Sequence, residues 1–263
     1  MVTIRPYDAA RSTKCLVGLC LGLCAMFMGP AAHAAEILVW SAGAAQTPLT
    51  LLIKDYQKST GDLVKVEFAP VGVLMKRLTE GGQPDVLVLT QDVLATVAGN
   101  GWSVAHTDSP LGRVGVGIAI QEGAPLPDIS TPEALRQTLL KAKSITYMDP
   151  NKGTSGKHFA AVLERLGIAE EMKAKTTLGD VGFVVEPVAR GELELGIQQI
   201  TEILPVKGAK LVGPLPEALQ KITTYCIVLG AKARDAASAR AFIASVKSEP
   251  SQAVFIANGF AAP

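Results

Sequence analysis

Cysteine is nearly absent from this chain beyond its N-terminal segment. Of the four cysteines, Cys15, Cys20 and Cys24 lie within the first 34 residues, and only Cys226 lies downstream. One thiol cannot form an internal disulfide bond, even in an oxidising compartment. Cys226 stands in the apolar run Tyr225-Cys-Ile-Val-Leu229, so we expect a buried, unreactive thiol rather than a nucleophile.

A long apolar run is also missing. The uncharged stretch at residues 15–28 is shorter than the ~20 residues of a membrane-spanning helix. It follows the basic residues Arg5, Arg11 and Lys14 and precedes Ala32-His-Ala34, the order of a secretory signal peptide. Cys20 and Cys24 each follow a leucine, unlike the cysteine of a lipoprotein signal. We therefore expect residues 1–34 to be a signal peptide cleaved near Ala34, with the mature chain in the periplasm.

An excess of charge of one sign is absent as well. The chain has 25 Lys and Arg against 24 Asp and Glu, and removal of Arg5, Arg11, Lys14 and Asp8 leaves 22 against 23. This balance disfavours nucleic acid or an anionic membrane as a partner. Aromatic residues make up only 5% of the chain, so no stacking platform for bases is expected.

Recognisable hydrolase and metal motifs are lacking too. The chain contains no Gly-x-Ser-x-Gly elbow and no His-Glu-x-x-His pair. Two histidines, His106 and His158, remain after residue 34, too few for a histidine-rich metal site. We therefore predict neither a metal ion nor any other cofactor.

Strand-like and helix-like segments alternate regularly along the rest of the chain. Strands with apolar residues throughout, such as residues 85–90, are typical of parallel sheets covered by helices on both faces. The sequence therefore predicts an α/β fold. The expected strands are residues 37–40, 64–68, 85–90, 114–120, 144–148, 194–197 and 224–229, and the expected helices 47–59, 72–79, 130–141, 157–166, 181–191, 233–245 and 250–258.

Two of these strands, residues 114–120 and 224–229, bracket the middle of the chain. If each crosses between lobes, one lobe consists of residues 35–112 plus 226–263 and the other of the inserted residues 113–225. Two parallel-sheet lobes joined by two strands form a clamshell that closes by hinge motion over a ligand.

Several motifs in order resemble the molybdate-binding proteins, a family with the type 2 periplasmic-binding-protein fold. They are Ile37-Leu-Val-Trp-Ser-Ala-Gly-Ala-Ala45, Phe68-Ala-Pro-Val-Gly-Val-Leu74, Gly82-Gln-Pro-Asp-Val-Leu-Val88, Tyr147-Met-Asp-Pro150, Gly153-Thr-Ser-Gly156 and Arg190-Gly-Glu-Leu-Glu-Leu-Gly-Ile197. The resemblance covers nearly all of the chain after residue 34. It implies an oxyanion held by short hydroxyl side chains and by backbone N–H groups at helix N-termini.

The hydroxyl side chains that the resemblance calls for are missing. Ala44 and Val71-Gly72 stand where the family has serines, and Gln199 stands where it has a tyrosine. What remains is backbone, at Gly43–Ala44, at Gly72–Val73, at Ser155–Gly156 and at the helix expected to start at Val181. Each missing charge-assisted hydrogen bond removes ~1.5–3 kcal/mol of binding free energy from molybdate, so we expect molybdate to bind less tightly than in that family.

Other polar side chains are expected near this pocket. Gln46 and Gln199 offer amides, Thr154 and Ser155 offer hydroxyls at a helix start, and the guanidinium of Arg113 could fork onto a carboxylate. Only one of Gln198 and Gln199 can face the cleft, since they are neighbours on a strand. A larger, amide-rich anion pocket suits a small organic di- or tricarboxylate.

The chain also resembles the periplasmic aconitate isomerases in fold and export. This resemblance implies interconversion of cis- and trans-aconitate by an allylic proton shift. His158 is then the first candidate for the base, Glu186 the second, and Tyr225 a proton relay. The alternative is a non-enzymatic binding protein that delivers molybdate or another small anion to an ABC transporter, and a third reading is a sensor module for a membrane receptor.

Overall fold

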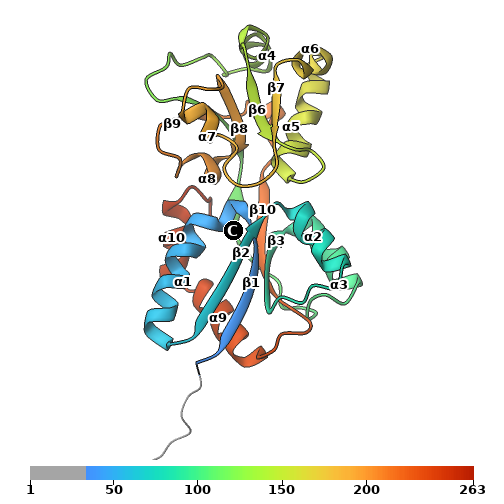
Figure 1. Cartoon of the computed structure of the whole chain (residues 1–263), viewed down its shortest axis with the longest axis vertical. Helices are drawn as coiled ribbons and strands as arrows, with labels where there is room; N and C mark the ends of the chain where they lie inside the picture. Colours follow the sequence, from blue (N-terminus) through green and yellow to red (C-terminus); the bar gives the residue numbers. More distant parts are fainter. Residues whose placement is uncertain (1–33) are drawn as a thin grey trace, which may run out of the picture. The chain divides into compact units, whose positions relative to one another are not determined.

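The computed structural model describes residues 34–263 (Figure 1). The expected signal peptide, residues 1–34, lies outside the described residues except for Ala34. Within 34–263, no helix is both long and apolar enough to cross a membrane. The strands are β1 Glu36–Ala42, β2 Leu63–Ala69, β3 Val86–Thr90, β4 Ser109–Val114, β5 Val116–Gln121, β6 Ile145–Met148, β7 Thr176–Gly179, β8 Leu195–Gln199, β9 Ala209–Pro214 and β10 Thr223–Leu229. The α-helices are α1 Gln46–Thr60, α2 Val71–Thr79, α3 Leu94–Gly99, α4 Pro132–Lys141, α5 Thr154–Arg165, α6 Ala169–Lys173, α7 Glu186–Ala189, α8 Ile200–Ile203, α9 Ala236–Val246 and α10 Glu249–Ala257, with the short 3-10 helices η1 Gly43–Ala45, η2 Gln91–Val93 and η3 Glu217–Leu219.

The first lobe is built on a five-stranded sheet in the order β2-β1-β3-β10-β4. Helices α1, α9 and α10 pack together on one face, and α2 and α3 lie on the other (Figure 1). Every residue of β3 is buried, which explains its continuous apolar run. The core of this lobe includes Leu49 from α1, Leu74 from α2 and Phe242 from α9.

The second lobe has its own five-stranded sheet, ordered β7-β6-β8-β5-β9. Helix α5 packs against β6 and β8, and its Phe159 makes an edge-to-face contact with Tyr147 of β6. The separate cores of the two lobes confirm the predicted two-lobed α/β clamshell.

The sheets are mixed rather than purely parallel. In the first lobe β10 runs antiparallel to both β3 and β4, and in the second β5 runs antiparallel to β8 and β9. The segment expected as one strand, residues 114–120, is divided at Gly115 into β4 and β5, which belong to different sheets. The chain therefore changes lobe at Gly115, where a Cβ atom would lie only 3.1 Å from Gln220 Nε2.

One predicted helix is wrong. Residues 181–191 contain only the four-residue α7, Glu186–Ala189. Gly182 adopts a left-handed φ of 73°, which prevents a helix from starting at Val181. The edge strands β7 and β9 were not predicted, since their partly exposed residues show no clear alternation. Cys226 is buried and unpaired, which confirms its predicted burial, and burial raises its pKa to about 11, which disfavours the reactive thiolate.

A buried carboxylate joins three segments of the first lobe at the start of β3. Asp85 is 1% exposed and accepts hydrogen bonds from the backbone N–H groups of Leu38, at 2.7 Å, and Arg234, at 2.7 Å. The Arg234 guanidinium adds an ion pair at 2.9 Å. Burial alone would raise the pKa of Asp85, but these hydrogen bonds outweigh it and the pKa is lowered. The carboxylate thus links β1, β3 and the segment before α9.

Candidate functional site

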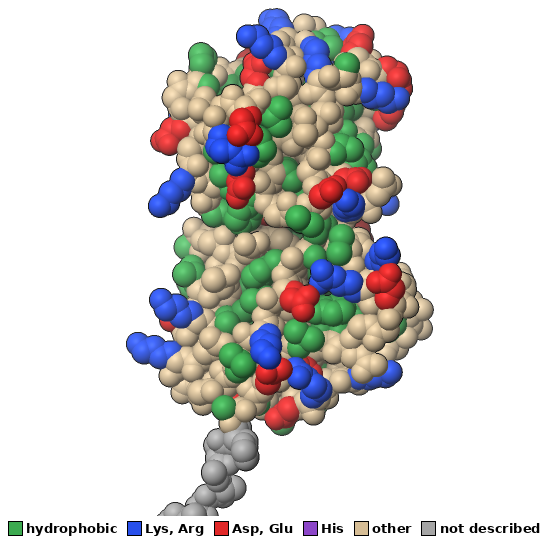
Figure 2. All heavy atoms as spheres, viewed as in Figure 1, with side chains coloured by type: hydrophobic (Ala, Val, Ile, Leu, Met, Phe, Trp, Pro, Cys, Tyr) green, Lys and Arg blue, Asp and Glu red, His purple; other side chains and the backbone are tan. Residues whose placement is uncertain are grey.

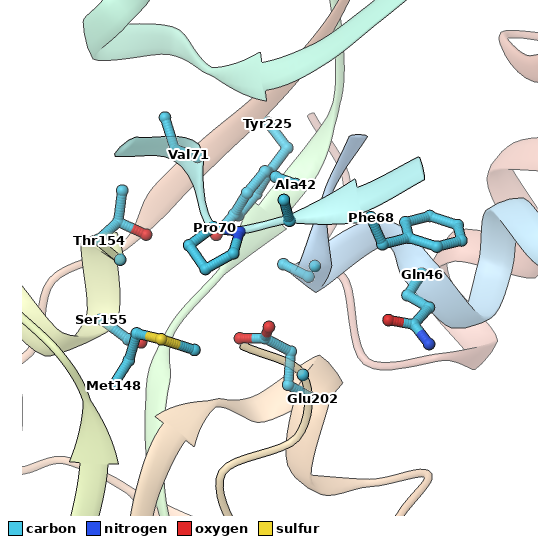
Figure 3. A pocket seen from close by; sticks show the side chains of 15 residues that line it. Ala42, Gln46, Phe68, Pro70, Val71, Met148, Thr154, Ser155, Glu202 and Tyr225 are labelled. Carbon is cyan, nitrogen blue, oxygen red and sulfur yellow. The ribbon is translucent and has the colours of Figure 1, made fainter. Parts of the chain in front are cut away.

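A pocket lies where the two lobes meet (Figure 3). About 470 Å³ of space, open solvent at its mouth included, lies among the residues that line it. On the face seen in Figure 2, charged side chains are spread over both lobes, and the band between the lobes is mostly apolar or uncharged. The pocket is lined by Ala42, Gly43, Ala44, Gln46, Phe68, Ala69, Pro70, Val71, Met148, Gly153, Thr154, Ser155, Gly182, Glu202 and Tyr225.

Three helix N-termini point their first residues at this pocket. Gly43 begins η1, Val71 begins α2 and Thr154 begins α5, and each of the three line it. None of these helices has a side-chain cap. The first N–H groups of a helix have no partner within the helix and carry the positive end of its dipole, so together they favour an anion.

The lining contains no positively charged side chain among residues 34–263. Its hydroxyl groups come from Thr154, Ser155 and Tyr225, and the hydroxyls of Thr154 and Tyr225 point toward each other in Figure 3. Burial raises the pKa of Tyr225, the charge of Glu202 raises it further, and hydrogen bonds with Thr154 and Gln199 oppose the shift. Tyr225 therefore remains a neutral hydrogen-bonding group.

Glu202 is the one carboxylic acid in the lining within the described part of the chain. It lies on α8, directly after β8, and its carboxyl group points into the pocket (Figure 3). Burial raises its pKa to about 8, although hydrogen bonds with Gln198 and with the backbone of Gln199 lower it. At neutral pH the group is therefore mostly protonated, and it can donate a hydrogen bond to an anion.

The two lobes also touch directly beside the pocket. The backbone N–H of Gly72, in the first turn of α2, donates a hydrogen bond of 2.9 Å to the carbonyl oxygen of Lys152. A Cβ atom at Gly72 would lie 2.8 Å from that oxygen and 3.1 Å from the carbonyl oxygen of Asn151. Glycine at this position therefore allows the lobes to approach each other.

The family of bacterial extracellular solute-binding proteins matches residues 37–261. The chain belongs to this family. Aconitate isomerase of a Pseudomonas species is 30% identical over 213 residues, which cover 79% of this chain and 80% of that enzyme. Molybdate-binding protein ModA of Azotobacter vinelandii is 26% identical over 255 residues, 92% of this chain and 96% of ModA. The solved structure of the periplasmic molybdate-binding protein of Azotobacter vinelandii has a TM-score of 0.75 at 17% identity and covers 87% of this chain and 100% of its own.

These relatives confirm the resemblance to molybdate-binding proteins that the sequence motifs indicated. The structural likeness, at 17% identity, supports the fold. In this member of the solute-binding family, three helix N-termini converge on the pocket between the lobes.

Six of the residues expected at the site line the pocket of this solute-binding protein. They are Gly43, Ala44, Gln46, Thr154, Ser155 and Tyr225. The Gly153-Thr-Ser-Gly156 motif supplies the start of α5, three residues before the helix expected from residue 157. A Cβ atom at Gly156 would collide with the carbonyl oxygen of Met148, so this glycine allows α5 to approach β6 closely.

The other expected binding residues lie outside the lining. Gly72 makes the contact with Lys152 between the lobes, and neighbouring Val73 packs against the core of the first lobe. Gln199 faces β10, and its Nε2 donates a hydrogen bond of 3.5 Å to Oγ1 of Thr223, the first residue of that strand. Val181 does not start a helix and is 66% exposed.

The charged residues expected at the site also lie elsewhere. Arg113 donates a hydrogen bond of 2.9 Å from Nε to the carbonyl oxygen of Ala262, and it lines a separate surface groove. The ring of His158 lies 2.8 Å from the carbonyl oxygen of Leu219, and burial lowers its pKa. Glu186 is exposed and faces Arg190 at 3.9 Å. The structure therefore places neither predicted base in the pocket lining.

Glu202 was missed because its setting in the sequence looks unremarkable. It follows the expected strand 194–197 by a few residues and stands between Ile200 and Ile203. A lone carboxylate in an apolar segment was the available signal, since glutamate is rarely buried without a partner. Within residues 34–263, no group of three or more His, Cys, Asp or Glu side chains could hold a metal ion.

Proposed function

We propose that this protein binds a small organic polycarboxylate between its lobes and interconverts cis- and trans-aconitate. The 30% identity to aconitate isomerase over most of both chains supports this assignment. The observation that carries it is the buried carboxyl group of Glu202 within a pocket formed by uncapped helix N-termini. A protonated carboxyl group can hold an anion by a hydrogen bond, and it can also give up and take back the proton that an allylic shift requires.

The binding part of the proposal follows from the donors in the pocket. Backbone N–H groups at three helix starts and the hydroxyls of Thr154 and Ser155 can each hold a carboxylate oxygen. The three helix starts come from both lobes, so several carboxylates of one ligand can be held at once. We place the mature protein in the periplasm, exported by residues 1–34, and its membership of the extracellular solute-binding family supports this.

The proposal is tested with the exported protein purified from periplasmic extract. We expect trans- or cis-aconitate at 100 times its dissociation constant to stabilise the native state by ~2.7 kcal/mol. For a chain of this size that corresponds to roughly 5–10 °C in Tm. Proton NMR should show each isomer converting into the other without added cofactor. Binding of molybdate or tungstate without any turnover of aconitate would reject the isomerase.

The second candidate is a non-enzymatic binding protein that delivers molybdate or another small anion to an ABC transporter. The similarity to ModA over 92% of this chain favours it. In this case molybdate or another oxyanion should raise the Tm more than either isomer of aconitate does.

A single substitution tests why molybdate is disfavoured. Ala44 lines the pocket at a helix start and has no hydroxyl group. We expect Ala44→Ser to strengthen molybdate binding by about tenfold, because one charge-assisted hydrogen bond contributes ~1.5 kcal/mol or more. Isothermal calorimetry with molybdate measures the change. Unchanged or weaker molybdate binding by the folded variant would contradict the role given to this position.

Ligand affinity should also depend on pH. Burial raises the pKa of Glu202 from 4.5 to about 8. The arrangement in which the lobes enclose this group is therefore favoured while the group is protonated, and it becomes less favourable as pH rises through about 8. Above that pH an ionised carboxylate faces an anionic ligand. We therefore expect the dissociation constant for trans-aconitate, measured by calorimetry at pH 6, 7, 8 and 9, to be constant at first and to increase above pH 8. A constant value across this range would contradict the buried protonated state.

A further inference from the structure

The proton-transfer group of the proposed reaction has to face the pocket. Only Glu202 and Tyr225 among the lining residues of the described chain carry an ionisable side chain. Burial and the nearby Glu202 raise the pKa of Tyr225, so it does not accept a proton from carbon near neutral pH. His158 and Glu186 lie outside the lining. This leaves the Glu202 carboxyl group.

The position of Glu202 is defined by close packing from both lobes. It belongs to α8 of the second lobe, and a Cβ atom at Gly43 of the first lobe would lie 2.6 Å from its Oε1 atom. Its neighbour Gln198 is held by a hydrogen bond of 2.9 Å from Nε2 to the carbonyl oxygen of Gly182, another lining residue. The carboxyl group therefore lies at the interface between the lobes and faces the pocket.

The chemistry requires a base stronger than an ordinary carboxylate. The methylene protons of aconitate are allylic and adjacent to a carboxylate, so they are weakly acidic. A group with a pKa near the working pH is the most effective in such a transfer, because it combines basicity with a useful ionised fraction. Burial moves Glu202 in this direction.

We infer that Glu202 is the catalytic residue that moves the proton between the two ends of the allylic system, a role that rests on the proposed aconitate isomerase function. In the first step the methylene C–H bond breaks and the proton forms an O–H bond with the Glu202 carboxylate. The C–H electron pair becomes a new C=C bond to the central carbon, and the former double-bond pair moves to the far carbon and its carboxylate. In the second step that carbon takes the proton, and the Glu202 carboxylate is regenerated without any net oxidation or reduction.

The negative charge that develops between the two steps lies on the carboxylates of the ligand. The unpaired N–H groups at the start of α5 and the hydroxyl groups of Thr154 and Ser155 can stabilise it. These are neutral, fixed donors, so they do not quench the Glu202 carboxylate as a lysine or arginine beside it would. The absence of cations from the lining of the described chain is thus compatible with Glu202 acting as a base.

The surroundings of Glu202 contain few groups that could share its titration. Helix α8 packs against η1, β5, β8 and β9. Among the residues of these elements the charged side chain is Lys210 of β9, which is exposed, as is Lys207 after α8. Tyr225 of β10 is the titratable neighbour whose pKa responds to the charge of Glu202. A change in the interconversion rate near pH 8 should therefore reflect the ionisation of Glu202.

The test uses the exported protein and the variant Glu202→Gln, whose amide has the shape of the protonated acid but cannot accept the proton. We expect the variant to bind trans-aconitate at pH 7 as the wild type does. The interconversion rate should fall by about 10²–10⁴-fold. In deuterium oxide the wild type should exchange the methylene protons of aconitate, and the variant should not. Glu171→Gln, an exposed glutamate of the same lobe, is the matched control and should leave rate and exchange unchanged.

Each outcome decides one question. If the wild type interconverts the isomers and folded Glu202→Gln retains the rate within a few-fold, the role of Glu202 is rejected and the isomerase function stands. If the wild type binds but neither interconverts nor exchanges protons, the function itself is rejected. Should Glu202→Gln fail to fold, Glu202→Asp keeps the acid while shortening its reach by one methylene. A reduced rate that still rises with pH would then support Glu202, and an unchanged rate would reject it.

Discussion

Gly72→Ala is expected to weaken ligand binding by about 10- to 100-fold and to leave the fold intact. The added Cβ atom would lie 2.8 Å from the carbonyl oxygen of Lys152, on the opposite lobe, and the hydrogen bond between the two residues would be strained or lost. Overpacking of this kind costs ~1–3 kcal/mol. The cost destabilises the arrangement in which the two lobes touch at Gly72 and Lys152, and with it ligand binding between them. Isothermal calorimetry with trans-aconitate measures the loss.

The same substitution should not reduce the stability of the lobes. Gly72 lies in the first turn of α2 and is exposed, and alanine is the better helix former by about 1 kcal/mol. The Tm without ligand should therefore be unchanged or slightly higher. Gly99→Ala is the matched control, because nothing lies within 4 Å of a Cβ atom there and its φ is not left-handed. Equal ligand affinity in both variants would refute the role of Gly72 in closure.

Asp85→Ala should destabilise the protein strongly, with a decrease of about 3 kcal/mol in the free energy of unfolding. The substitution leaves the N–H groups of Leu38 and Arg234 without their acceptor, and each orphaned group costs ~1–3 kcal/mol. The ion pair with Arg234 adds less, because that side chain is 52% exposed. Urea denaturation gives the free energy, and a thermal scan should show a Tm lower by roughly 6–12 °C.

The pH dependence separates this network from a simple packing defect. Because the folded pKa of Asp85 is lowered, its contribution is present above its ordinary pKa of 3.8 and is lost as pH falls below that value. The stability gap between wild type and Asp85→Ala should therefore narrow in acid. The exposed Asp55 gives the control, and Asp55→Ala should change stability by less than about 0.5 kcal/mol. A similar loss in both variants would contradict the assignment.

The sequence predicted the architecture well where a segment is buried on a regular pattern. Strand β3 was expected because its residues form a continuous apolar run up to Thr90, and α4 because a capping residue and then Pro132 stand at its start. The break at Gly115 was not expected, since residues on both of its sides are apolar and the division reflects which sheet each half joins. Pairing between distant strands decides such a boundary, and local patterns do not record it.

The pocket was predicted only in part, because local sequence patterns identify some of its residues and long-range packing places the others. Thr154 and Ser155 follow a strand and start a helix, a local pattern that identifies a site. His158, one turn further on, faces Leu219 instead, because the residue that a helix presents to a cleft depends on how the helix is seated. Glu202 enters the pocket only through the packing of α8 against η1 of the other lobe, a long-range contact that no local pattern encodes.

The cation-free lining described above has a kinetic consequence. Fixed backbone dipoles act over a few ångströms, whereas a cluster of lysines or arginines attracts anions from about a Debye length, roughly 10 Å at 0.1 M salt. Anions should therefore reach this pocket by unsteered diffusion, with an association rate that hardly changes between dilute and concentrated salt. In the proposed periplasmic location, where the ionic strength varies, the protein would then capture its ligand at a nearly constant rate.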